Sequence, residues 1–167
     1  MKSAFSTLTQ LTLIASLALT MAACKQEEAA VVAAKPAMSV PATDDSTAWR
    51  EYVQDVIGRN IPEGLTNQPY VYFLPGESTE DFAGSYERLS EKAKSDVARG
   101  IVAGNMLAYV SPASGKMADM IVDAFAGVQP DTMKDVRVLF IGKAEDNERV
   151  KAAVTPAGVN YVFIEAK

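Results

Sequence analysis

The chain has 167 residues, with 16 basic and 21 acidic side chains, one cysteine and no histidine, and its formal net charge is −5. The missing histidine excludes a Ser-His-Asp triad, a Cys-His dyad and a His-ligated zinc site, and a single cysteine excludes an internal disulfide or a CxxC redox pair. Because the chain is acidic, it lacks the basic surface that nucleic-acid binding requires, and we expect no nucleic-acid partner.

The first 23 residues have the organisation of an export signal. Lys2 is the only charged residue before Lys25, and an apolar stretch follows from Leu8 to Ala23. The stretch ends in small residues, as signal-peptide cleavage regions do. Its most apolar part, Leu11–Leu19, is well short of the roughly 20 apolar residues that cross a bilayer. We therefore predict a cleaved signal over residues 1–23 and not a transmembrane anchor.

The lone cysteine, Cys24, directly follows Met21-Ala22-Ala23. This arrangement resembles the lipobox of bacterial lipoprotein precursors, in which an aliphatic residue and two small residues precede the cysteine. Met21 stands where leucine is usual in that family. The resemblance covers residues 1–24 only. The alternative is ordinary signal cleavage nearby, which would leave Cys24 as a free thiol.

The lipobox resemblance implies a lipid-modified amino terminus. In that family a diacylglycerol is joined to the cysteine sulfur, the signal is cut before the cysteine, and the new amine is acylated, commonly with palmitate. More than one chain gives stable anchoring, since each buried CH₂ contributes about 0.8 kcal/mol. Lys25 replaces the aspartate that favours inner-membrane retention in the Gram-negative members. We expect attachment through Cys24 to the outer membrane, facing the periplasm.

Residues 24–44 have the composition of a linker. They are rich in alanine, contain Pro36 and Pro41, and show no lasting apolar period, which is typical of a flexible tether. Removing residues 1–23 removes one lysine, so the mature chain carries 15 basic and 21 acidic groups, a net charge of −6. We predict a lipid-anchored flexible linker over residues 24–44 and a single folded domain over residues 45–167.

The domain begins with an amphipathic helix. Apolar residues recur at helical spacing after Ser46, and they are Trp49, Tyr52, Val53, Val56 and Ile57. Asp45 or Ser46 is suited to cap its start and Gly58 to end it. The position of Trp49 on this face predicts a core residue rather than a ligand-stacking one.

Short apolar runs then alternate with helical patterns. The runs are Tyr70–Leu74, Met106–Val110, Val136–Ile141 and Tyr161–Ile164, and each is continuous, as in strands covered on both faces. Helical spacing appears within residues 86–101, 117–125 and 150–154. Strand-helix alternation predicts an α/β fold: a small, Rossmann-like three-layer sandwich of about four mostly parallel strands with helices on both faces. The sequence does not indicate the strand order.

The loop after the second apolar run is the best candidate for a ligand site. Ligands of open parallel sheets bind beyond the carboxyl ends of the strands. Ser111, Ser114, Gly115 and Lys116 stand there, and a helix start with a nearby lysine suits a phosphate or a carboxylate. The loop is not a P-loop, because it lacks the first glycine and the Ser or Thr after the lysine. The alternative is that Ser114 only caps the helix and Lys116 is solvated.

Two acidic loops are weaker candidates. Glu77, Glu80 and Asp81 follow the first run, and Glu145 and Asp146 follow the third. Carboxylates can bind Ca²⁺ or transfer protons, but no calcium-loop spacing is present, and Asp146 is suited to cap a helix. There is no Gly-x-Ser-x-Gly nucleophile motif. We therefore expect no metal and no cofactor.

These observations favour a lipid-anchored envelope protein with a non-catalytic domain that binds a protein partner. Two alternatives stay open. One is a small-ligand or anion-binding domain at Ser114–Lys116. The other is a hydrolase that works without histidine, through carboxylates or a Ser-Lys mechanism with Ser78, Ser111 or Ser114 as the nucleophile.

Overall fold

The computed structural model describes residues 36–167, which belong to one compact unit. The predicted signal segment, Cys24 and the first part of the predicted linker lie outside these residues. Within the described part, no helix is both long and apolar enough to cross a membrane.

The described chain contains four α-helices, four strands and one short 3₁₀ helix, η1. In chain order they are α1 (Ser46–Arg59), β1 (Tyr70–Phe73), α2 (Phe82–Ala98), β2 (Met106–Val110), α3 (Ser114–Phe125), β3 (Arg137–Gly142), α4 (Ala144–Val154), η1 (Thr155–Ala157) and β4 (Asn160–Glu165). All four predicted apolar runs form strands, with ends that agree to within one residue. The last helix is longer than its apolar residues indicated, because its first turns are polar.

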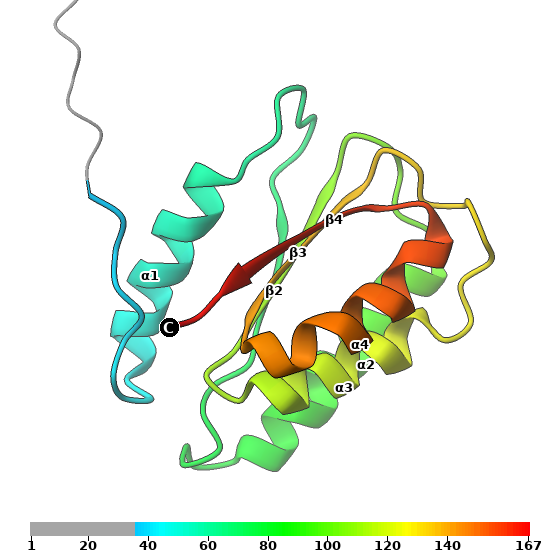
Figure 1. The fold of residues 1–167 in the computed structure, drawn as a ribbon. Helices are drawn as coiled ribbons and strands as arrows, with labels where there is room; N and C mark the ends of the chain where they lie inside the picture. The colour runs from blue at the N-terminus through cyan, green and yellow to red at the C-terminus, as the bar shows by residue number, and fades with distance from the viewer. Residues whose placement is uncertain (1–35) are drawn as a thin grey trace, which may run out of the picture. The chain divides into compact units, whose positions relative to one another are not determined.

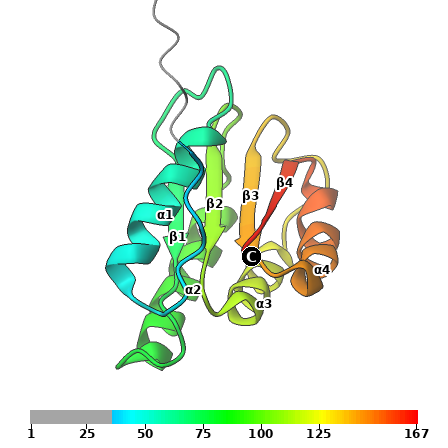
Figure 2. The same cartoon turned by 60° about the vertical axis from the view of Figure 1, so that its left-hand side comes forward.

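The strands form one parallel sheet in the order β1-β2-β3-β4. Each strand lies beside the next one in sequence, so the right-handed crossovers place α2, α3 and α4 on the same face. Helix α1 covers the opposite face (Figures 1 and 2). The predicted three-layer α/β sandwich with helices on both faces is therefore confirmed. The strand order does not reverse, so the sheet has no topological switch point, the place where doubly wound sheets bind ligands.

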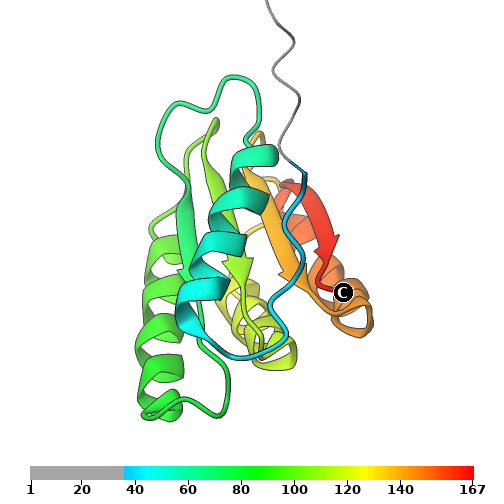
Figure 3. The same cartoon turned by 90° about the vertical axis from the view of Figure 1, so that its left-hand side faces the viewer.

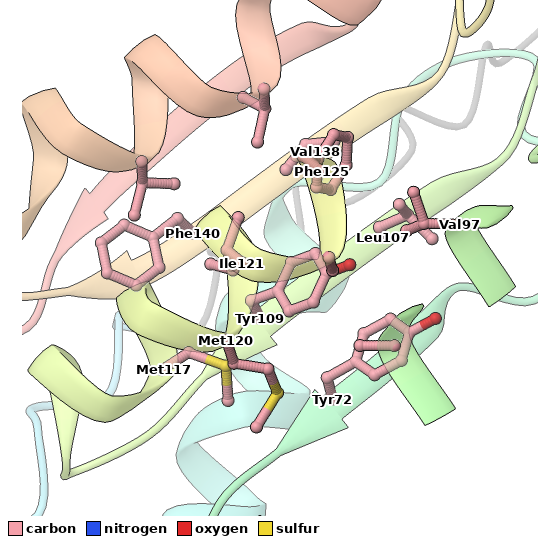
Figure 4. Close-up of a cluster of buried hydrophobic side chains, with 14 of the residues drawn as sticks. Tyr72, Val97, Leu107, Tyr109, Met117, Met120, Ile121, Phe125, Val138 and Phe140 are labelled. Carbon is pink, nitrogen blue, oxygen red and sulfur yellow. The ribbon is translucent and has the colours of Figure 1, made fainter. Parts of the chain in front are cut away.

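The thicker core lies between the sheet and helices α2–α4. Tyr72, Tyr109 and Phe140 project from successive strands and are fully buried. Met117 and Ile121 of α3 pack over them (Figure 4). Full burial of one such side chain contributes about 1.5–3 kcal/mol, so this layer dominates the stability of the domain.

The second core layer lies under α1. The apolar face predicted for this helix packs against the sheet, and Trp49 is only 3% exposed. Its indole Nε1 donates a hydrogen bond to the Thr43 carbonyl, 2.9 Å away. Trp49 is thus a core residue, as its spacing predicted. The helix begins as expected, since Asp45 accepts a hydrogen bond from the Ala48 amide at 2.7 Å. It continues through Gly58 and ends at Arg59.

Residues 36–44, here named the N-terminal strap, lie along α1 (Figure 3). The Pro36 carbonyl accepts a hydrogen bond from Arg59, and the Met38 amide donates to Asp55. Met38 and Val40 pack against the core beneath α1. These nine residues were placed in the flexible linker from their composition, whereas the structure places them on the domain. Their two apolar side chains are too few to form a period that a sequence pattern could reveal.

Candidate functional site

The carboxyl ends of β2 and β3 bring together two of the predicted ligand residues. Ser111 and Ser114 are 1% and 3% exposed and line a small cavity of about 210 Å³ with Gly142 and Lys143. The N-terminal strap covers one side of this cavity, from Val40 to Asp44. Gly115 and Lys116 are exposed and do not line it.

The hydroxyl of Ser114 is fully engaged by protein groups. It donates to Asp146 Oδ2 at 2.7 Å and accepts from the Lys143 amide at 2.8 Å. Asp146 is 6% exposed, and its other oxygen receives two hydrogen bonds from Arg149. Arg149 also donates to the Gly115 carbonyl and pairs with Asp119. This network joins the starts of α3 and α4.

The caps of α3 and α4 differ from the expected ones. Ala113, not Ser114, is the N-cap residue of α3, and the Ala113 amide donates to the Ser111 hydroxyl at 2.9 Å. Lys143, not Asp146, is the N-cap residue of α4. Asp146 lies within the first turn instead, where its negative charge interacts favourably with the positive end of the helix dipole. Its burial against Ser114 is a contact between distant residues, which local spacing cannot reveal.

The acidic loop after β1 forms surface contacts. Ser78 donates to Asp44 of the strap at 2.6 Å, and Asp81 pairs with Arg88 at 3.0 Å. Asp81 precedes α2 with a positive φ of 57° and makes no side-chain cap bond. Within residues 36–167, no group of three acidic side chains is arranged to hold a metal ion. Ser78, Ser111 and Ser114 each form a hydrogen bond within the domain, and the contacts found for them include no lysine side chain.

A buried polar cluster lies between α2 and the sheet. Asp96 is 5% exposed and accepts a hydrogen bond from the Tyr72 hydroxyl at 2.9 Å. Lys92 and Arg99 also pair with Asp96. Burial alone would raise the pKa of Asp96, but the hydrogen bonds from Lys92, Tyr72 and Arg99 lower this pKa below its ordinary value. The carboxylate therefore stays ionised at neutral pH.

The ring of Tyr109 stacks on that of Tyr72 at a centroid distance of 4.6 Å. The Tyr109 hydroxyl is buried and has no hydrogen-bond partner in the described part of the protein. Burial raises the pKa of both tyrosines far above the ordinary value, so neither ionises near neutral pH. This cluster was not predictable from the sequence, because its members come from three separate elements that meet only in the folded domain.

An apolar groove of about 430 Å³ runs between α1 and β1 at the edge of the sheet. Val71 and Ile61 in it are 44% and 49% exposed, which is unusual for large apolar side chains beside a core. Arg50, at the same groove, makes no ion pair among residues 36–167. The lining residues are Arg50, Val53, Gln54, Ile57, Gly58, Ile61, Gln68, Pro69, Val71 and Phe73.

Strand β1 also offers unpaired backbone groups, since it is an edge strand (Figure 2). The Leu74 amide donates to the Val110 carbonyl of β2, so Leu74 points toward the sheet. The N–H and C=O of one residue in a strand point to the same side, and the side alternates along the chain. The amides and carbonyls of Val71 and Phe73 therefore point away from β2.

Comparison of the chain with protein-family models, with curated proteins and with solved structures gave no match. The class of protein is therefore defined by the fold alone: a singly wound parallel α/β domain with one exposed apolar edge. The function must be inferred from this edge and from the predicted tether.

Proposed function

We propose that this protein is a lipid-anchored lipoprotein of the cell envelope, attached through Cys24, whose α/β domain binds an extended segment of a partner protein along β1. The anchor rests on the lipobox resemblance of residues 1–24. The expected location is the outer membrane, with the domain in the periplasm. The domain acts by binding and not by catalysis.

The open edge of β1 is the observation that carries the binding proposal. An extended peptide pairs with such an edge through main-chain hydrogen bonds, while its side chains occupy neighbouring pockets. Val71 and Phe73 supply the unpaired backbone groups, and their side chains face the groove beside α1. Backbone pairing and apolar burial thus act on the same four-residue strand.

The charge of the groove favours a particular peptide. Arg50 is exposed and has no carboxylate partner in residues 36–167. The groove itself is mostly apolar, with Ile57, Ile61 and Val71 on its walls. The best occupant is therefore an extended segment with alternating apolar side chains and one acidic residue near Arg50, since alternate side chains of a strand face one side.

Crosslinking in living cells tests the edge. A photo-reactive residue at Gln68, which is exposed and lines the groove, should give an adduct with a distinct protein. The same residue at Glu87, exposed on α2, should give none and serves as the control. Val71→Asp should remove the Gln68 adduct, because a carboxylate replaces the apolar contact.

Two further variants separate backbone pairing from side-chain burial. Val71→Ala removes the side chain and keeps the amide, whereas Val71→Pro also removes the outward N–H. Pairing along the edge predicts a larger loss of the adduct with proline than with alanine. Adducts with lipid, or with a second copy of this chain, would contradict the proposal, as would a protein adduct that survives Val71→Asp.

The anchor is tested independently of the edge. Labelled palmitate should enter the wild-type protein and not Cys24→Ser, and the wild type should fractionate with the outer membrane. Equal labelling of both proteins would refute the lipid attachment. The crosslinking result would still decide the role of β1.

A further inference from the structure

A second cavity, of about 700 Å³, lies at the amino end of the sheet, opposite the serine loops. Its walls come from the segment after α1 and from the loops that precede β2, β3 and β4. The lining residues are Pro62, Glu63, Gly64, Leu65, Gly104, Asn105, Asp135, Arg137, Gly158, Val159 and Asn160. The proposed role of β1 does not involve this cavity.

Two side chains with free hydrogen-bonding groups stand next to each other in it. Arg137 and Asn160 begin β3 and β4 and are register partners. Register partners on parallel strands project from the same face of the sheet. That face is the one covered by α1, because the next inward residues, Leu139 and Val162, pack beneath α1. No hydrogen bond of the Asn160 side chain occurs within residues 36–167.

The guanidinium of Arg137 has only part of its hydrogen-bonding capacity satisfied by the domain. Its Nη1 donates to the Asn60 carbonyl at 2.9 Å, while its Nε is buried and lacks an acceptor in the described residues. It also forms no ion pair there. The other basic residues without an ion pair in this part of the chain are exposed, and they are Arg50, Lys116, Lys143 and Lys151. A partly buried guanidinium with no counterion calls for an acceptor that the domain itself does not provide.

The geometry of the free groups selects a carboxylate. With Nη1 engaged and Nε buried, the free donors at the cavity are Nη2 of Arg137 and the side-chain amide of Asn160, and two neighbouring donors suit the two oxygens of one carboxylate. Glu63 and Asp135 line the same cavity, are exposed and pair with no basic residue of residues 36–167. Their two negative charges disfavour a simple anion and favour a ligand that also carries a cation.

We propose that this cavity binds a free amino acid in its zwitterionic form. The α-carboxylate is held by the guanidinium of Arg137 and by the side-chain amide of Asn160, and the ammonium group faces Glu63 and Asp135. No bond is made or broken, so the site is a binding site only.

Calorimetric titration of the full chain in mild detergent tests this site. Each standard amino acid is the probe, with acetate, methylammonium and inorganic phosphate as references. At least one amino acid should bind with a Kd about tenfold or more below that of acetate. Arg137→Gln should raise this Kd about tenfold or more, and Arg137→Lys should bind with an intermediate Kd because it keeps the charge but loses the planar guanidinium.

Two further variants show whether a change in Kd is specific to the cavity. Arg88→Gln removes an exposed arginine of α2 and should leave the Kd unchanged. Asn160→Ala alters an exposed side chain, so it should fold normally and still weaken binding, even if Arg137→Gln does not fold. Three results would overturn the proposal: no amino acid binds, phosphate alone binds, or both site variants bind like the wild type.

Discussion

Ser114 and Asp146 connect the first turns of α3 and α4 across the carboxyl ends of β2 and β3, with 2.7 Å between the hydroxyl and Asp146 Oδ2. Both side chains are buried, and the same hydroxyl also accepts from the Lys143 amide. A structural contact thus lies at the carboxyl ends of the strands, beside the small cavity where the ligand site was expected. A serine that sequence analysis regarded as a ligand residue serves here to fix two helices.

Replacing Ser114 with alanine should lower the free energy of unfolding by about 1–3 kcal/mol. The change leaves Asp146 Oδ2 and the Lys143 amide without this partner in a buried place. Urea unfolding followed by circular dichroism measures the loss. Ser95→Ala on the exposed face of α2 is the matched control and should change stability by less than about 0.5 kcal/mol. Equal effects of both variants would show that the hydroxyl contributes little.

Gly142 and Gly115 should respond differently to alanine. A Cβ at Gly142 would lie 2.4 Å from the buried Phe140 ring and 2.6 Å from Ser114 Oγ, so we expect a loss of about 2 kcal/mol or more. At Gly115 the nearest atom would be 3.7 Å away, and alanine should be neutral or stabilise α3 by up to about 1 kcal/mol. Thermal unfolding of the two variants provides the comparison. A stable Gly142→Ala protein would contradict the close packing found here.

The two stacked tyrosines offer a matched pair of hydroxyl deletions. Tyr72→Phe removes the hydrogen bond to Asp96 and should cost about 1 kcal/mol. Tyr109→Phe removes a buried hydroxyl without a partner in the described residues and should leave stability unchanged or slightly raised. Denaturant midpoints of the two variants measure the difference. The reverse order would indicate that the Tyr109 hydroxyl, and not that of Tyr72, has the stronger partner.

The ionised state of Asp96 should make stability depend on pH. Its folded pKa lies below the ordinary 3.8, so its contribution is complete above about pH 4 and is lost as the pH falls through the folded pKa. Asp96→Asn should cost about 1–2 kcal/mol at neutral pH, a modest value because Lys92 and Arg99 are largely exposed. The gap between wild type and variant should then shrink below pH 4. A gap that stays constant down to pH 2 would show that the charge contributes nothing.

The strands were predictable because their apolar runs are local and continuous. Met106–Val110 is buried on both faces, and a run of this kind has few other solutions in a soluble domain. The order of the strands was not predictable, since it depends on contacts between distant segments. The same limit applies to the exposure of Val71, which follows from the edge position of β1, and to Arg137, which reads as the polar start of an apolar run.

The functional candidates were predictable only in part. Placing Ser111 and Ser114 at the carboxyl ends of the strands was correct, because that position follows from strand-helix alternation. The hydrogen bond between Ser114 and Asp146 was not predictable from the sequence, since the two residues are 32 positions apart. The N-terminal strap escaped detection because alanine and proline dominate the composition around its two apolar side chains.

The N-terminal strap runs antiparallel to α1, so Pro36, the first residue that the structure describes, lies beside the amino ends of the strands. From Cys24 to Pro36 the chain can extend by at most about 40 Å. Among the strap contacts in the described residues, a pull on the amino terminus would break the one between Pro36 and Arg59 before the one between Met38 and Asp55. Its full release would add about 30 Å of length while α1 and the sheet stay folded. In the proposed lipoprotein, the strap would therefore provide reserve length between the membrane and the bound partner.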